Sequence, residues 1–203
     1  MTACREGKAL RDELGMDLTV SVNLSPRQFQ QRNLVEVIEN SLNESGLPAR
    51  NLEIEITENM LMINSDGNLD KLQKIRELGA RISIDDFGTG FCSFSYLLQY
   101  QVDRLKIDQS FVKQAGTDPN AAAVVRTIIA MSHGLNIQVV AEGVETDEQL
   151  RFLVRRKCDE AQGHFVARPV AAKDFSVAVR ACADNSIMRS ASGRWLAAEH
   201  QLS

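Results

Sequence analysis

Short apolar runs rich in β-branched residues recur along this chain, and each is followed by a stretch with helical periodicity. Parallel strands need a long crossover between them, and a helix is the usual crossover. The alternation therefore predicts an α/β fold in which parallel strands alternate with helices. The predicted strands cover residues 18–24, 52–56, 81–85, 104–107, 137–141 and, with a weaker pattern, 160–162.

Helix signals lie between these predicted strands. Leu34, Ile38 and Leu42 share one helical face, and Gly46 follows them as a stop signal. Three comparable signals follow: a stripe of Leu69, Leu72, Ile75 and Leu78 that ends at Gly79, a Pro119 start for a run that ends at Gly134, and a capping box of Thr146 with Gln149.

The length of 203 residues suits one domain with a sizeable hydrophobic core. Hydrophobic residues make up 44% of the chain and charged residues 25%, as in a globular domain. We expect one domain over residues 1–182. Residues 183–203 are rich in Ser and Ala and are predicted to form a C-terminal helix or a flexible tail.

Charge and cysteine content restrict the partners and the compartment. The net charge of −4 argues against nonspecific DNA or RNA binding, which needs clustered Lys and Arg. The four cysteines lack a CxxC spacing and are read as reduced thiols, which favours a cytoplasmic location. No apolar run approaches the roughly 20 residues of a membrane span, so we expect no membrane contact by this segment.

Polar and acidic residues stand at the downstream ends of the predicted strands. In a parallel barrel these ends form one face, which is where barrel enzymes carry their active sites. Any one such residue alone is more readily explained as a helix N-cap or a solvated loop group. The residues are Asn23, Glu55, Glu58, Asp85, Asp86, Lys106, Glu142, Glu145 and Gln162.

As a set, these carboxylates indicate a divalent cation, because several carboxylates at one place repel one another unless a cation neutralises them. Oxygen donors favour Mg²⁺ or Mn²⁺ over zinc. The adjacent Asp85 and Asp86 suit two ions, with one carboxylate bridging them. Lys106 interrupts an apolar strand and would be costly to bury without a partner. Gly88 and Gly90 either let a loop approach a ligand or form a tight turn.

The motifs together resemble one family, the EAL domain, over about residues 20–170. They occur in the family's order: SVNLSPRQF, LEIEITEN, SIDDFGTGFCS, LKIDQSFV, VVAEGVET and QGHFVARPV. The resemblance implies a TIM-like β/α barrel. It also implies hydrolysis of the bacterial second messenger cyclic di-GMP to linear pGpG.

The resemblance also implies a role for each matching residue. Asn23, Glu55 and Asp85 would bind a first metal, and Asp85, Asp86 and Glu142 a second. Lys106 would hold the attacking water or the phosphate, while Glu142 is alternatively a general base. Glu58 would anchor the DDFGTG loop, and Gln162 would contact substrate.

The sequence departs from the family pattern at its start. The Glu-Ala-Leu tripeptide does not occur in residues 1–203, so we expect the barrel to be incomplete, without its first two strands and that metal-binding glutamate. This predicts a phosphodiesterase that is impaired on its own. Two alternatives stay open, an inactive module that binds cyclic di-GMP or another protein, and a fragment without a folded function. Exposed strand edges need covering, so we expect a homodimer or a further segment of the protein to cover them. An upstream sensor or cyclase domain is a separate expected partner.

Overall fold

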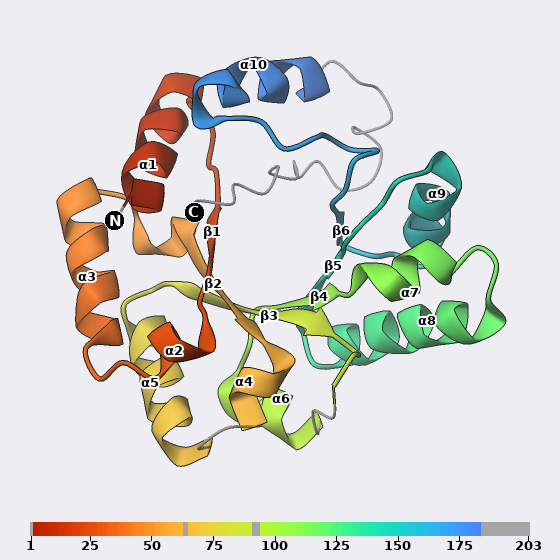
Figure 1. The fold of residues 1–203 in the computed structure, drawn as a ribbon, viewed down its shortest axis with the longest axis horizontal. Coiled ribbons are helices and arrows are strands. Elements are labelled where there is room, and N and C mark those ends of the chain that lie inside the picture. The colour runs from red at the N-terminus through yellow and green to blue at the C-terminus, as the bar shows by residue number, and fades with distance from the viewer. Residues whose placement is uncertain (1, 63–64, 91–93, 184–203) are drawn as a thin grey trace. The chain divides into compact units, whose positions relative to one another are not determined.

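A computed structural model describes residues 2–62, 65–90 and 94–183 of the chain. These residues divide into two compact units. The first unit covers residues up to 84 together with 94–102, and the second covers 85–90 and 103–183. Figure 1 shows the helices and strands of both.

The first unit begins with helix α1 and carries two strands and part of a third. Strand β1 (Val20–Asn23) runs parallel to β2 (Leu52–Thr57), with Val20 opposite Leu52 and Asn23 opposite Glu55. Helix α1 packs against β1 and α3, and α3 packs against α5. The helices of this unit are α1 (Thr2–Leu14), α2 (Pro26–Phe29), α3 (Leu34–Ser45), the 3₁₀ turn η1 (Ala49–Asn51), α4 (Glu58–Met62), α5 (Ser65–Glu77) and α6 (Phe94–Tyr100).

The core of the first unit follows the apolar patterns of the sequence. Leu34, Ile38 and Leu42 are buried on α3, which ends at Gly46 in the left-handed conformation, with φ 67°. Glycine adopts this conformation without steric cost, and it allows the Gly46 N–H to donate to the Leu42 carbonyl. On α5, Leu72 and Ile75 are fully buried.

Strand β3 (Arg81–Phe87) continues from the first unit into the second, and the division falls after Ile84. Strand order follows chain order, β1-β2-β3 in the first unit and β3-β4-β5-β6 in the second. Strands β4 (Arg104–Ile107), β5 (Gln138–Ala141) and β6 (Glu160–Ala161) are parallel, with Arg104 opposite Gln138.

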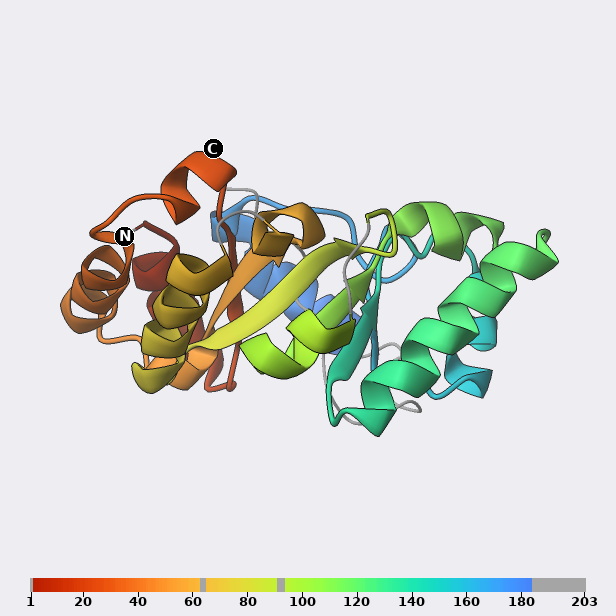
Figure 2. The same ribbon diagram turned by 90° about the horizontal axis from the view of Figure 1, so that it is seen from below.

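Four helices accompany the strands of the second unit. The longest, α8 (Pro119–Gly134), packs against α7 (Gln109–Gln114) and against β4 and β5, as Figures 1 and 2 show. Helix α9 (Asp147–Arg155) begins with the predicted capping box, in which the Thr146 side chain accepts from the Gln149 N–H. Helix α10 (Ala172–Ala183) ends the described chain.

All six predicted strands are present in the structure, each within a few residues of its predicted bounds. The prediction of an α/β fold with parallel strands is therefore confirmed. Most of the predicted tail, residues 184–203, lies outside the described residues. Within the described ranges, no helix is both long enough and apolar enough to cross a membrane.

Candidate metal centre

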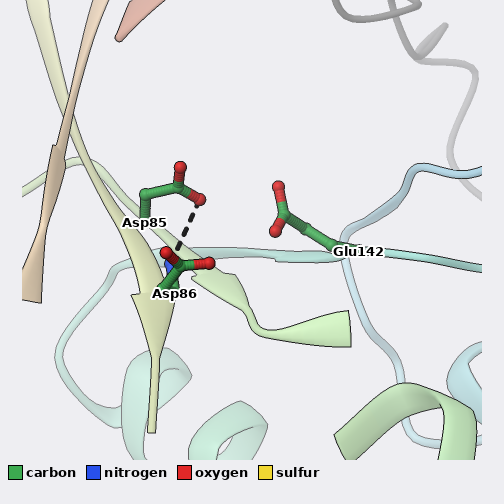
Figure 3. A group of neighbouring side chains, drawn as sticks. All are labelled: Asp85, Asp86 and Glu142. Carbon is green, nitrogen blue, oxygen red and sulfur yellow. Dashed lines mark hydrogen bonds between the residues drawn. The ribbon is translucent and has the colours of Figure 1, made fainter. Parts of the chain in front are cut away.

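Three carboxylates come together at the carboxyl ends of β3 and β5. Each of Asp85, Asp86 and Glu142 offers an oxygen, and these oxygens all lie within 4.8 Å of one another. Figure 3 shows Asp85 and Asp86 on β3 and Glu142 directly after β5, with the three carboxyl groups close together. The backbone pattern explains the placement of Asp85, because alternate residues of a strand face opposite sides. Ile82 and Ile84 are fully buried, so Asp85 lies on the other face.

Lys106 lies between two of these carboxylates. Its Nζ atom is 3.2 Å from Asp85 Oδ1 and 2.7 Å from Glu142 Oε1, and its side chain is 2% exposed. Its neighbours Leu105 and Ile107 are fully buried and turn the Lys106 side chain to the opposite face of β4. The two ion pairs compensate the buried ammonium group, which would otherwise be costly in an apolar strand.

Asp86 has an unusual backbone and a perturbed carboxyl group. Its φ of 53° is rare for a residue other than glycine, and such conformations concentrate at functional sites. Its N–H donates to Asp85 Oδ1 at 3.1 Å. Burial raises the pKa of the Asp86 carboxyl, and the neighbouring carboxylates of Asp85 and Asp108 raise it further. A bound cation would reverse this effect, because it favours the ionised form.

Sequence reasoning missed Asp108 and Gly143. Asp108 follows β4, caps α7 by accepting from the Ser110 N–H at 3.0 Å, and adds negative charge beside Asp86. Its Asp-x-Ser pattern is an N-cap signal that could have identified it. Gly143, with φ 66°, follows Glu142, and a Cβ there would lie 2.5 Å from the Gln109 Cβ. The close approach of α7 to this turn therefore requires glycine.

The other predicted site residues are distributed between the two units. Asn23, the last residue of β1, is opposite Glu55, which lies two residues before the end of β2, and the Leu24 N–H donates to the Glu55 carbonyl at 2.9 Å. Glu58 is the first residue of α4 and, like Glu55, is 3% exposed. In the second unit, the Gln162 N–H donates to the Ala141 carbonyl at 2.8 Å, next to Glu142.

The donor set fits a hard divalent cation. The clustered side-chain donors of Asp85, Asp86 and Glu142 are carboxylate oxygens, which Mg²⁺ and Mn²⁺ prefer. The Asp85 and Glu142 side chains are 16% and 14% exposed, so they are held in place without being closed off from solvent. Such an arrangement suits an ion that must also contact a substrate.

Comparison with known proteins gives the family. A family model described as the EAL domain matches residues 1–169. The chain belongs to the EAL domain family. It is 44% identical over 173 residues to the signaling protein YkoW of Bacillus subtilis, a match that covers 85% of this chain and 22% of that protein.

Solved EAL structures share this fold. The PaMucR phosphodiesterase in complex with c-di-GMP matches with a TM-score of 0.82 and 39% identity, over 85% of this chain and 70% of that one. BlrP1 of Klebsiella pneumoniae, solved with manganese and cyclic di-GMP, matches with a TM-score of 0.74 and 30% identity over 81% of this chain and 43% of that one. The prediction of an EAL-type, TIM-like α/β fold is thereby confirmed.

The chain spans about a fifth of the length of the curated relative YkoW. MucR of Pseudomonas aeruginosa is named as a bifunctional diguanylate cyclase and cyclic di-GMP phosphodiesterase. This chain is 38% identical to MucR over 177 residues, a match that covers 87% of this chain and 26% of MucR. Relatives of this EAL domain are therefore much larger proteins.

Proposed function

We propose that this EAL domain hydrolyses cyclic di-GMP to pGpG with two divalent cations, Mg²⁺ or Mn²⁺. The observation that carries the proposal is the placement of Lys106, buried between Asp85 and Glu142 within a group of three carboxylates. Structural carboxylates gain little from such crowding, whereas phosphate-ester hydrolysis needs clustered negative groups to hold cations. Two similar solved proteins carry cyclic di-GMP.

The proposed metal ligands are Asn23, Glu55 and Asp85 for one ion, and Asp85, Asp86 and Glu142 for the other. When bound, the cations would lower the pKa of water and stabilise charge on the oxygens around phosphorus. In the reaction, water adds to one phosphorus and the bond from that phosphorus to a ribose 3′ oxygen breaks, which opens the ring to pGpG.

The residues of the chain would bind and orient the reactants. The Lys106 ammonium would hold the attacking water or a phosphate oxygen, and it donates to Asp85 and Glu142 before substrate arrives. Glu142, which lies 2.7 Å from that ammonium, would accept a proton as a general base if it does not bind metal. Glu58 would anchor the loop that follows Asp86, and Gln162 would contact the substrate.

Further properties belong to the same proposal. Residues 1–182 would form one EAL domain in the cytoplasm, followed by a C-terminal segment. The large size of the relatives supports a further sensor or cyclase domain as a partner in the same protein. A homodimer is a second proposed partner arrangement.

The test compares pGpG formation by residues 1–203 with that of a longer protein, in which the Glu-Ala-Leu segment of a relative precedes them. With Mn²⁺, the longer protein is expected to form pGpG and the chain of residues 1–203 to form it slowly or not at all. The family resemblance implies that the Glu-Ala-Leu glutamate is an anionic metal ligand, and small misplacements of reacting groups cost orders of magnitude in rate. Full activity from residues 1–203 alone would refute the expected impairment. Binding without turnover in both proteins would favour the alternative of an inactive binding module.

A further inference from the structure

A second polar layer lies at the amino ends of β4, β5 and β6, at the other end of the strands from the candidate metal centre. Arg104, Gln138 and Glu160 are the first residues of these three strands. The Arg104 Nη2 atom donates to Glu160 Oε1 at 2.7 Å, and Arg104 Nε donates to Gln138 Oε1 at 3.2 Å. The Arg104 and Glu160 side chains are 11% and 9% exposed. A nearly buried ion pair thus connects β4 to β6 across β5.

The residues of this layer share a face of the sheet with residues of the site. Side chains two positions apart in a strand point to the same face. Lys106 is two residues after Arg104, and Gln162 is two residues after Glu160. On β5, Glu142 is four residues after Gln138. Lys106 lies within β4, whereas Glu142 and Gln162 directly follow β5 and β6, so a predicted site residue lies at an even spacing downstream of each member of the polar layer.

Strand β6 depends more than its neighbours on side-chain interactions to fix its register. It is two residues long, with Val140 opposite Glu160 and Ala141 opposite Ala161. Strands of this length contribute little pairing energy of their own. A slip of one residue would turn Gln162 to the opposite face and remove it from the side of Glu142. The same slip would separate Glu160 from Arg104 and leave two poorly solvated charges apart, which is strongly unfavourable.

We propose that the Arg104–Glu160 ion pair, with Gln138, sets the register of β6 and so positions Gln162 beside Glu142 for substrate binding. This inference rests on the proposed function for its effect on cyclic di-GMP. Arg104, Gln138 and Glu160 are positioning residues, because they act through the strand and lie at its far end from the site. Buried ionic groups have their best-attested use as determinants of register.

The test uses the double variant Arg104→Met/Glu160→Leu in the full chain. Single variants would leave one buried charge without its partner and can fail to fold, whereas replacing both partners with apolar residues is often neutral for stability. We expect the double variant to keep the wild-type unfolding midpoint. The Gln162 backbone N–H donates to the Ala141 carbonyl. Its hydrogen-exchange rate should rise about tenfold or more in the double variant, because β6 opens locally. Exchange in β5 should change much less.

The second readout is affinity for cyclic di-GMP, measured with Ca²⁺ to limit turnover, since the BlrP1 relative was solved with calcium and this ligand. We expect the double variant to bind about tenfold more weakly, a loss of about 1.4 kcal/mol. The charge-swap variant Arg104→Glu/Glu160→Arg should restore at least part of both the exchange protection and the affinity. The matched control is Asp147→Ala/Arg151→Ala, which removes an exposed ion pair of the same 2.7 Å separation on α9 and should change neither readout.

Two results would overturn the inference. Unchanged exchange at Gln162 in a folded double variant would show that the ion pair does not set the register. Faster exchange with wild-type affinity would show that the register does not position Gln162 for substrate. If the double variant does not fold, the charge-swap variant decides. Exchange and affinity in the charge-swap variant that match those of the wild type support the inference, and loss of both in that variant refutes it. If the wild-type chain binds no cyclic di-GMP, the proposed function fails and the exchange measurement still decides the register.

Discussion

Replacing Lys106 with methionine tests how far the buried ammonium holds the three carboxylates together. The substitution keeps most of the side-chain volume and removes the charge. Lys106 Nζ lies 2.7 Å and 3.2 Å from two carboxylate oxygens. At an effective dielectric constant of about 20, each contact corresponds to roughly 5–6 kcal/mol of Coulomb attraction, and desolvation offsets much of it. Removing one partner of a buried ion pair costs about 3–5 kcal/mol net.

We therefore expect Lys106→Met to lower the free energy of unfolding of the metal-free protein by about 3–5 kcal/mol. Urea denaturation followed by circular dichroism measures this change. Saturating Mn²⁺ should recover part of the loss, because a cation among the carboxylates replaces the missing positive charge. In the longer protein that includes the Glu-Ala-Leu segment, Lys106→Met should abolish pGpG formation even with Mn²⁺, since it lacks the group that would hold water or phosphate.

Lys113→Met is the matched control. Lys113 pairs with Glu145 at 3.1 Å, but both side chains are more than two-fifths exposed. Exposed pairs of this kind contribute about 0–1 kcal/mol. A loss below about 1 kcal/mol for Lys106→Met, equal to that of Lys113→Met, would refute the electrostatic reasoning.

Three further predictions concern the carboxylates and a thiol. Calorimetric titration should show that Asp85→Asn weakens Mn²⁺ binding more than Glu58→Gln does, because Asp85 would coordinate directly, and equal losses would contradict these roles. In metal-free protein, burial is the main cause of the raised pKa of Asp86. A raised pKa in the folded state means that the ionised carboxylate destabilises the fold, whereas the protonated carboxyl does not. Asp86→Asn should therefore be more stable than wild type at pH 7, with the difference shrinking as pH falls toward 3.8, and a difference that grows toward low pH would refute the sign. Burial raises the pKa of Cys158 to about 12, so iodoacetamide at pH 8 should leave Cys158 unmodified in native protein, and rapid labelling there would contradict its packing.

Local signals in the sequence were enough to predict the framework of the fold. Val, Ile and Leu runs predicted five of the strands, and a weaker pattern predicted β6. Glycine or capping residues predicted the end of α3 and the start of α9. These features depend on residues a few positions apart, so a single sequence carries them. Strand ends then indicated Asp85, Asp86, Lys106 and Glu142 as neighbours, and the second unit brings these four together.

Features that depend on distant residues could not be predicted in this way. Arg104 and Glu160 are 56 positions apart, and each alone reads as a solvated strand residue. The left-handed backbone of Asp86 is only weakly indicated by its residue type, because Asp adopts positive φ more often than most residues but still in a small minority of cases. Asp108 carried a local N-cap signal, but its charge near Asp86 follows from the pairing of β3 with β4.

The central claim is that Asp85, Asp86 and Glu142 bind a divalent cation beside Lys106. Anomalous X-ray scattering from crystals of this protein grown with Mn²⁺ tests it most directly, because manganese is located without any assumption about its ligands. We predict an anomalous peak bonded to carboxylate oxygens of Asp85 and Asp86, which disappears in Asp85→Asn. Density for these side chains with no manganese among them at saturating Mn²⁺ would contradict the claim.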